Sequence, residues 1–356
     1  MLRIRPASVS ALAAIFLTLS ACSTPADNNA EPSQPESQAK VSEELKPTEE
    51  PLVIYSGRNE KLVAPLMEEF TKDTGVKVDI RYAGTPELAA QLLEEGEKTP
   101  AQVFLSQDAG ALGLISGADM FAPLDKSVTE KVAPEYTSHD GSWVGLTGRA
   151  RVMAYDSEKL TADEVPADVF ELTDPKWNGK VGIAPTNASF QSFVTAMRVM
   201  EGEEKTEKWL TDLKANNVQT FAKNGEILEA VNNGAVEIGL INHYYWARSE
   251  QDPKTLRAQL KFGKPGSVTA LVNVTGVGIL KKAADNPNAQ IFVDYMLSDK
   301  AQDYFLEKTF EYPLLKGAKS PANVPALNEL GGPDVKLSEL SSLNETIELL
   351  TKVGML

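Results

Sequence analysis

Hydrophobic positions along the chain follow two alternating periods, which predict strands and helices in turn. Residues 52–55 form a short apolar run that ends at Gly57, as a buried strand ends at a turn. Between 60 and 74 the apolar residues recur at helical spacing, and Gly75 follows as a stop signal. Residues 76–82 alternate apolar and polar positions, so they are expected to form a second strand.

A further strand–helix unit follows, with a helix at 86–97, a strand at 102–105 and a helix at 109–117. Such alternation implies parallel strands with helices on both faces. Ligands of these sheets bind beyond the carboxyl ends of the strands. The turns 56–59 and 106–108 lie at those ends, and they are therefore the expected ligand loops.

An extended segment at 143–155 leads into a second α/β run and predicts a crossing between two domains. The apolar stretch 268–280 is typical of a long strand that carries the chain back. The tail from Pro287 onward has a mostly helical pattern. The elements expected in between are a strand at 181–183, helices at 188–200, 204–216 and 226–232, and a strand that ends before Tyr244.

Residues 1–22 have the pattern of a lipoprotein signal peptide. Two arginines precede an apolar run at 9–19, which is too short to span a bilayer as a helix. Small residues then precede Cys22, the only cysteine of the chain. We expect Cys22 to carry lipid and to tether the protein to a membrane. Residues 23–50 are rich in Ser, Pro and Glu, and they are expected to form a disordered acidic linker.

Composition argues against several classes of function. The net charge of −15 argues against a nucleic-acid partner. With Cys22 lipidated, the folded part has no thiol for catalysis or for disulfides. The sequence has no zinc-ligand spacing and no phosphate-binding glycine loop, and no serine has a recognisable nucleophile setting. The chain is therefore expected to be a binding protein and not an enzyme.

The most informative stretch is 242–246, Asn-His-Tyr-Tyr-Trp, which follows an apolar run directly. Neighbouring residues of a strand point to opposite faces, but at a strand end the hydroxyls of Tyr244 and Tyr245 could face one cleft. Phenols titrate near pH ~10, so at neutral pH they ionise only beside a strong cation such as Fe(III). The alternative is an aromatic core cluster, which these five residues alone favour slightly. His243 is expected to point away from at least one of the tyrosines.

Other polar residues near strand ends suit either ligand binding or a local structural role. Residues 187–189 open a helix, where free amides attract anions, although Asn187 could be only a helix cap. Asn224 precedes another helix, and capping is the preferred interpretation there. Arg149 and Arg151 share one face of the extended segment. Each is expected to pair with a carboxylate in preference to neutralising a bound anion.

Six short stretches keep their order and approximate spacing across most of residues 52–313. They are Ile-Tyr-Ser-Gly at 54–57, Pro-Ala-Gln-Val-Phe at 100–104, Leu-Thr-Gly-Arg-Ala-Arg-Val at 146–152, Asp-Pro-Lys-Trp at 174–177, Ala-Lys-Asn at 222–224 and Leu-Ile-Asn-His-Tyr-Tyr-Trp at 240–246. Together they resemble the bacterial periplasmic ferric-ion-binding proteins, the iron(III) members of the ABC-transporter solute-binding family.

The resemblance implies an α/β fold of the two-lobed periplasmic-binding-protein type II architecture. Each lobe would be a mixed sheet flanked by helices, and the ligand would lie in the cleft between the lobes. The first lobe would comprise 52–146 plus 271–310, and the second 147–270 plus 311–356.

The resemblance also implies a metal site. In that family two adjacent tyrosines bind iron through phenolate oxygens, and they match Tyr244 and Tyr245. An external anion such as phosphate or carbonate completes the shell in similar members. The residues that match its seat are Asn187, Ala188, Ser189, Asn224 and Asn242.

The first lobe departs from the family pattern. The usual histidine and glutamate ligands are replaced by Asn59 and Gln107, and a third tyrosine of one subgroup is replaced by Phe190. Amide oxygens are neutral and bind Fe(III) less well, so we expect Asn59 and Gln107 to be weak or indirect contacts. Asp108 could fill an open coordination position. Arg58 could hold the anion by forked hydrogen bonds.

The predicted function is that of a monomeric, extracytoplasmic lipoprotein that captures ferric iron and delivers it to an ABC permease and its ATPase. Two alternatives remain at this stage. The same scaffold could bind another anionic solute such as a phosphonate, with the tyrosines as stacking walls. The chain could also be a non-transport sensor module outside the cytoplasm.

Overall fold

A computed structural model describes residues 45–356 of the protein. The predicted signal peptide at 1–22, its lipid-attachment residue Cys22 and most of the predicted linker lie outside the described residues. At the end of that linker, the Thr48 amide and the Glu50 carbonyl each hydrogen-bond the Asn288 side chain at 2.9 Å, so these residues belong with the folded part. Among the helices of residues 45–356, none is both long enough and apolar enough to span a bilayer.

The first half of the fold confirms the predicted strand–helix units. Strand β1 lies between β2 and β3, and both pairings are parallel. Helix α1 begins after Asn59, whose side chain caps it, and ends at Gly75, which has a φ of 75°. The elements are β1 (Leu52–Ser56), α1 (Glu60–Thr74), β2 (Val78–Tyr82), α2 (Thr85–Glu95), β3 (Val103–Ser106), α3 (Ala109–Gly117) and α4 (Lys126–Thr129).

The second half repeats the arrangement, with β5 parallel to β6 and to β7. The predicted helices are present, and the tyrosine pair lies in a short helix that begins directly after β7. The elements are β5 (Val181–Ile183), α5 (Ala188–Glu201), α6 (Glu203–Ala215), β6 (Gln219–Thr220), α7 (Asn224–Asn232), β7 (Ile238–Asn242), α8 (His243–Ala247) and β8 (Ala258–Phe262).

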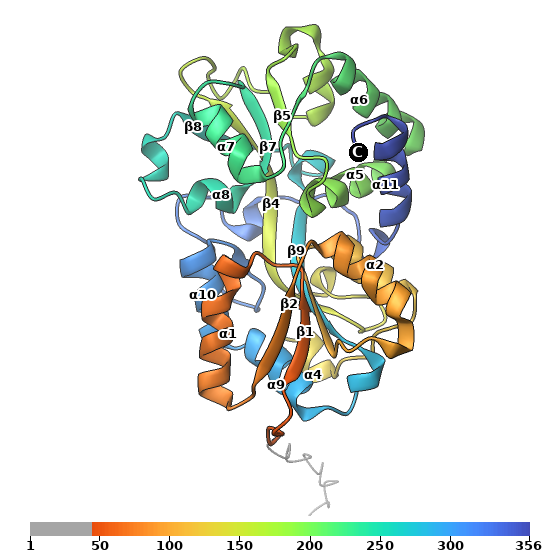
Figure 1. The fold of residues 1–356 in the computed structure, drawn as a ribbon. Helices are drawn as coiled ribbons and strands as arrows, with labels where there is room; N and C mark the ends of the chain where they lie inside the picture. The colour runs from red at the N-terminus through yellow and green to blue at the C-terminus, as the bar shows by residue number, and fades with distance from the viewer. Residues whose placement is uncertain (1–44) are drawn as a thin grey trace, which may run out of the picture. The chain divides into compact units, whose positions relative to one another are not determined.

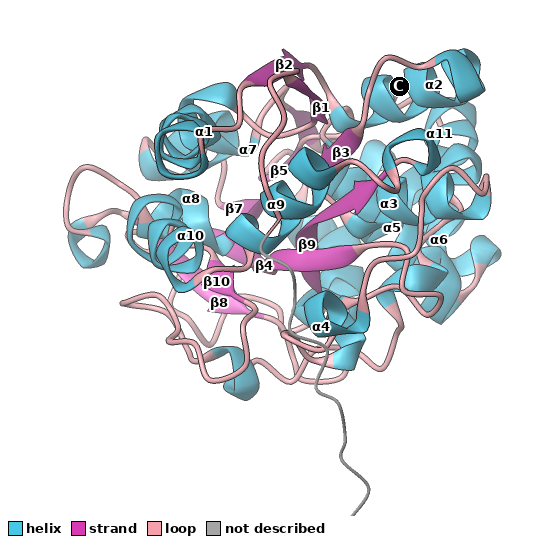
Figure 2. Ribbon diagram, turned by 90° about the horizontal axis from the view of Figure 1, so that it is seen from below, coloured by secondary structure: helices cyan, strands magenta, loops and turns pink. Residues whose placement is uncertain are grey.

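One long strand, β4 (Val144–Asp156), joins the two halves (Figure 1). It pairs antiparallel with β9 (Val272–Ile279) up to Ala150, and from Arg151 onward with β7 and β8. The sheets are therefore mixed, as the two-lobed architecture implies, because the two crossing strands run against their parallel neighbours. Figure 2 shows the strands lying between two groups of helices.

The prediction of a mostly helical tail is wrong for its middle part. Helices α9 (Pro287–Met296) and α10 (Asp299–Tyr304) are followed by a π-helical turn at 305–309 and by β10 (Tyr312–Pro313). From 314 to 342 only two short 3₁₀ turns form, before α11 (Leu343–Lys352). Apolar residues of this stretch, such as Leu337 and Leu340, are buried against the core. Their three-residue spacing reflects burial from a single 3₁₀ turn and not an α-helix.

Candidate metal and anion site

The rings of the tyrosine pair lie against each other at the start of α8, tilted by 31°. The ring centroids of Tyr244 and Tyr245 are 4.4 Å apart, and Tyr244 is almost fully buried whereas Tyr245 is half-buried. Neither hydroxyl hydrogen-bonds another group within residues 45–356, and neither is among the buried side-chain atoms that lack a partner, so both oxygens are open to solvent. An aromatic core cluster would enclose both hydroxyls, whereas here both oxygens remain open to a ligand.

The surroundings of Tyr244 keep its hydroxyl protonated when no cation is bound. Burial raises its pKa well above the ordinary value for tyrosine, and Tyr245 and Glu311 raise it further. Arg58 and Arg149 lower this pKa but do not overcome the burial. A ligand that binds Tyr244 as a phenolate must therefore carry a high positive charge, since it has to displace the hydroxyl proton.

His243 is not available as a ligand, because both of its ring nitrogens are engaged. Its Nδ1 accepts a hydrogen bond from the Ala150 amide at 3.1 Å, so Nε2 carries the proton and donates to the Phe310 carbonyl at 2.9 Å. Burial lowers the pKa of His243 to about 4, so the ring is neutral at physiological pH. The residue holds the start of α8 against β4.

Arg149 and Arg151 do not pair with carboxylates as predicted. Both are buried, and neither forms an ion pair with any residue from 45 to 356. Arg149 donates to the Ser189 hydroxyl at 3.1 Å, to the Val274 carbonyl at 3.2 Å and to the Gln107 carbonyl. The prediction placed both arginines on an acidic surface, whereas β4 carries both into the interior, where Arg149 contacts the two halves and Arg151 lies over α5.

Arg151 is the more unusual of the two arginines. All three of its guanidinium nitrogens are buried without a hydrogen-bond partner within the described part of the chain. The guanidinium lies over the rings of Phe190 and Phe193, 5.7 and 5.1 Å from their centroids. Burial lowers the pKa of Arg151 to about 9, and Arg149 contributes to the shift. Phe190 is thus a wall beside a cation and not a ligand.

The predicted anion seat is partly assembled around one hydroxyl. Ser189 Oγ receives hydrogen bonds from Asn242 Nδ2 at 3.1 Å, from Gln107 Nε2 at 3.4 Å and from Arg149. Ala188 is the first residue of α5 and is buried. Gln107 comes from the first half and Ser189 from the second, so the contact joins the two halves.

Asn187 and Asn224, two of the three asparagines of the seat, have different roles. Asn187 caps α5, since its side chain accepts a hydrogen bond from the Ser189 amide at 3.0 Å. The preferred interpretation of Asn224 as a cap is wrong, because Lys223 occupies the cap position of α7. Asn224 is fully buried, and both of its side-chain polar atoms lack partners within residues 45–356. Its amide is therefore free to contact a ligand.

The two ligand loops of the first half differ in burial: one carries the exposed Asn59 and the other the buried Asp108. Asn59 is exposed, and its oxygen caps α1 by accepting from the Lys61 amide at 3.0 Å. Asp108 caps α3, and the same oxygen accepts from Ser192 Oγ at 2.8 Å. Its other oxygen is buried without a partner among the described residues, and burial raises the pKa of this carboxyl.

Arg58 is fixed by a carboxylate that sequence reasoning missed. Its Nη2 forms a 2.7 Å ion pair with Glu311, and its Nη1 donates to Thr275 Oγ1 at 2.9 Å. Only Nε lacks a partner within residues 45–356. The fork that was expected to hold an anion is thus occupied by protein groups. Glu311 is 253 residues away in sequence, and no local pattern could have indicated it.

Positive charge is in excess around the two phenols. Arg58 and Arg149 act on Tyr244, Arg151 acts on Tyr245, and Arg248 lies 5.0 Å from the Tyr245 ring centroid. The buried carboxylates among these groups are Glu311 and Asp108. No three His, Cys, Asp or Glu residues within 45–356 are grouped to hold a metal. A hard cation here would depend on the phenol oxygens and on an anion brought from solution.

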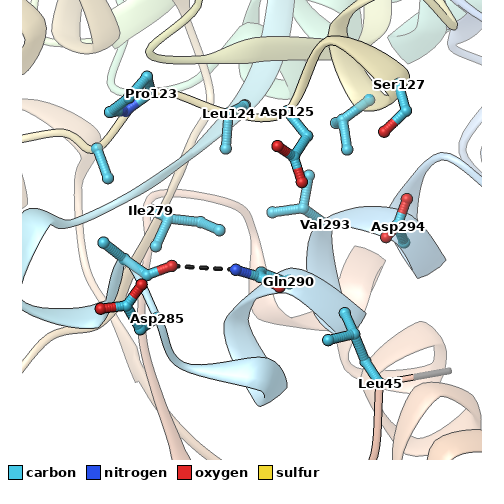
Figure 3. Close-up of a pocket in the computed structure, with 13 residues that line it drawn as sticks. Leu45, Pro123, Leu124, Asp125, Ser127, Ile279, Asp285, Gln290, Val293 and Asp294 are labelled. Atoms are coloured by element: carbon cyan, nitrogen blue, oxygen red, sulfur yellow. Dashed lines mark hydrogen bonds between the residues drawn. The ribbon is translucent and has the colours of Figure 1, made fainter. Parts of the chain in front are cut away.

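A separate cavity of about 300 Å³ lies away from this site (Figure 3). It is lined by residues such as Pro123, Ile279 and Gln290 and contains none of the predicted site residues. Gln290 hydrogen-bonds the Ala284 carbonyl at 3.1 Å across its floor. Nothing in its lining suits a metal with phenolate ligands.

Comparisons with known proteins agree with the geometry. A family model described as "Bacterial extracellular solute-binding protein" matches residues 98–330. The "Fe(3+)-binding periplasmic protein" of Serratia marcescens is 34% identical over 86% of this chain and 90% of its own length. The "Major ferric iron-binding protein" of Neisseria meningitidis is 33% identical over 85% and 93%. The crystal structure of iron-bound HitA from Pseudomonas aeruginosa superposes with a TM-score of 0.80 at 33% identity, covering 85% of this chain and 99% of that one.

Proposed function

The chain belongs to the bacterial extracellular solute-binding proteins, and from this premise we propose that its cargo is ferric iron. Relatives that cover most of its length carry iron-binding names, and the solved structure of one of them holds iron. In this proposal Tyr244 and Tyr245 bind the ion as phenolates, and no reaction is catalysed. The protein adopts the two-lobed type II fold of these relatives.

One observation carries the proposal: two stacked, adjacent tyrosines have hydroxyls without a protein partner beside several guanidinium groups. An apolar core would leave such hydroxyls unsatisfied at a cost in free energy. A trivalent cation would displace the protons of both hydroxyls and use both oxygens as ligands. The surrounding arginines then stabilise the phenolates and the accompanying anion.

The anion is a necessary part of the proposed site. The family's histidine and glutamate positions hold Asn59 and Gln107, and Asn59 is exposed and occupied in capping. We propose that phosphate or carbonate completes the shell, held by Ser189, Asn224 and Asn242. The unpartnered guanidinium of Arg151 and the nearby charge of Arg149 favour such an anion.

We further propose that the protein acts outside the cytoplasm as a monomer and delivers iron to an ABC permease and its ATPase. Cys22 would carry a lipid anchor. The lobes would comprise 52–146 plus 271–310 and 147–270 plus 311–356. The change of partner strand along β4, between Ala150 and Arg151, supports a hinge close to this border.

A phosphonate or another anionic solute is the weaker candidate. Anions alone would satisfy the arginines and could use the tyrosine rings as stacking walls, but they would leave the two phenol hydroxyls without a role. A sensor module without a transport role would use the same binding site, and the names of the relatives give it no support.

The test is the visible spectrum of the purified protein during titration with ferric nitrilotriacetate, with phosphate or carbonate present. A phenolate-to-iron charge-transfer band should appear and saturate at one equivalent of iron. Protein that stays colourless, contains no iron by elemental analysis and does not change its melting temperature would refute iron as the cargo.

Single tyrosine variants assign the band. Tyr244→Phe and Tyr245→Phe should each abolish or strongly shift it. Tyr295→Phe is the matched control. The Tyr295 hydroxyl, on α9, donates to Asp73 of α1, so this substitution should leave the band unchanged. A band that survives both site substitutions would remove the pair from the shell.

A further inference from the structure

Glu311 is fully buried and joins groups that come from distant parts of the chain. One carboxylate oxygen pairs with Arg58 Nη2 at 2.7 Å, and the other accepts from Thr147 Oγ1 at 2.8 Å. Thr275 Oγ1 completes the arrangement by accepting from Arg58 Nη1 at 2.9 Å. Of the ion pairs within residues 45–356, Arg58–Glu311 alone has both side chains at or below 1% exposure.

This arrangement is linked to the tyrosine pair, because Phe310 and His243, the residues directly before Glu311 and Tyr244, hydrogen-bond each other at 2.9 Å. Burial lowers the pKa of Arg58, whereas Glu311, Tyr244 and Tyr245 raise it, and the net shift is upward. The guanidinium therefore interacts favourably with both phenols once they ionise. The loop that carries Arg58 packs closely on Thr85: a Cβ on Gly57 would lie 1.9 Å from Thr85 Oγ1, which donates to the Gly57 carbonyl at 3.3 Å.

The backbone around Glu311 adds a link to the other side of the site. Phe310 has a left-handed conformation with φ of 57°, which is unusual for a bulky residue. Its carbonyl accepts the hydrogen bond from His243, the residue directly before Tyr244. Consecutive residues thus contact Arg58 in the first half and the tyrosine helix in the second. Strained backbone of this kind often occurs at functional sites.

We propose that Glu311 is a positioning residue, which holds the Arg58 guanidinium against the tyrosine pair and thereby sets how tightly iron and its anion are retained. The inference rests on the proposed function. Glu311 itself is not a metal ligand in this account, because both of its oxygens are engaged by Arg58 and Thr147. Glu311, Thr147 and Thr275 together hold the Arg58 guanidinium in one orientation. In this orientation its charge is directed toward the phenols.

The experiment compares variants of the full chain loaded with ferric nitrilotriacetate and phosphate. Its readouts are the wavelength of the charge-transfer band and the chelator concentration that removes half of the iron. Glu311→Gln keeps the shape of the side chain but removes the charge-assisted bond to Arg58. Such bonds correspond to roughly a tenfold or larger change in an equilibrium constant, so iron retention should fall by at least that factor and the band should shift.

Glu311→Gln leaves Arg58 buried without its countercharge and could fail to fold. Thr147→Val and Thr275→Val give a second route, because each removes one hydroxyl contact at nearly constant shape and charge. Both should weaken iron retention several-fold and shift the band in the same direction. Thr346→Val is the matched control, since its hydroxyl accepts from Arg198 Nη1 at 2.8 Å, as Thr275 accepts from Arg58. It should change neither readout.

A double-variant cycle separates positioning from general stability. In an Arg58→Gln background, Glu311→Gln should have almost no further effect on the band or on iron retention. Equal effects of Glu311→Gln with and without Arg58 would overturn the inference, as would unchanged threonine variants. If the unsubstituted protein shows no band, the proposed function itself fails, so the two failures are distinguishable.

Discussion

Arg151 is the residue whose environment is hardest to explain by stability alone. A buried cation without a partner is costly, and apolar replacements of buried charges are often neutral or stabilising. The guanidinium is retained between two phenylalanine rings, close to Arg149 and Tyr245. The Arg151 guanidinium should therefore lower the stability of the iron-free fold and favour binding of an anion.

Arg151→Met should raise the free energy of unfolding of the iron-free protein by about 1 kcal/mol or more. The reason is that an apolar side chain of similar volume replaces a buried charge that has no partner. The same substitution should weaken retention of iron with phosphate at least about tenfold. Urea unfolding and chelator competition measure the two effects. Arg198→Met is the control: this arginine bonds Glu203, Ser342 and Thr346, so its loss should destabilise the protein and leave iron retention unchanged. A destabilised Arg151→Met variant with normal iron retention would contradict the assignment.

His243 makes the stability of the iron-free protein depend on pH. Its pKa falls from 6.5 to about 4 on folding, so the unfolded state binds more protons between these values. The contribution is fully present above the unfolded value and is lost as the pH falls toward the folded value. It amounts to about 3 kcal/mol for a shift of this size. Urea unfolding near neutral pH and near pH ~4.5 should show a smaller loss for His243→Gln than for the unsubstituted chain. Equal losses in the two proteins would show that other groups titrate in its place.

At the scale of elements, the starts of α5 and α7 separate helix capping from ligand binding. Asn187→Ala removes the cap of α5 and should cost about 1 kcal/mol of unfolding free energy. Asn224→Ala removes no cap, because Lys223 holds that position, and it also removes two unsatisfied polar atoms. It should cost little stability yet weaken retention of the anion and iron. Urea unfolding and anion-dependent iron titration are the measurements. A large loss of stability in Asn224→Ala with unchanged iron titration would give this residue a structural role only.

The elements that sequence could predict are those set by local pattern. The strand–helix units from β1 to α3 follow from periodicity and from stop signals such as Gly75. Local pattern failed in the stretch 314–342, where Leu337 and Leu340 pack on the core from a short 3₁₀ turn and not from an α-helix. It also failed at Asn224, because polar residues before a helix look alike whether they cap it or point elsewhere.

At the scale of the whole molecule, the site exists because β4 and β9 bring the two halves together. The tyrosines and Ser189 could be nominated from sequence, since each directly follows a strand or opens a helix. Glu311 could not, because its contact with Arg58 spans most of the chain. Likewise, burial of Arg149 and Arg151 depends on the neighbours of β4 in the sheet, which local sequence does not specify.

The most direct test of the central claim is anomalous diffraction at the iron edge from crystals of the ferric-loaded protein. The account predicts one strong peak within bonding distance of the hydroxyl oxygens of both Tyr244 and Tyr245, with an anion on its far side near Ser189. A loaded crystal with iron elsewhere, or with both hydroxyls out of bonding reach of the metal, would contradict it.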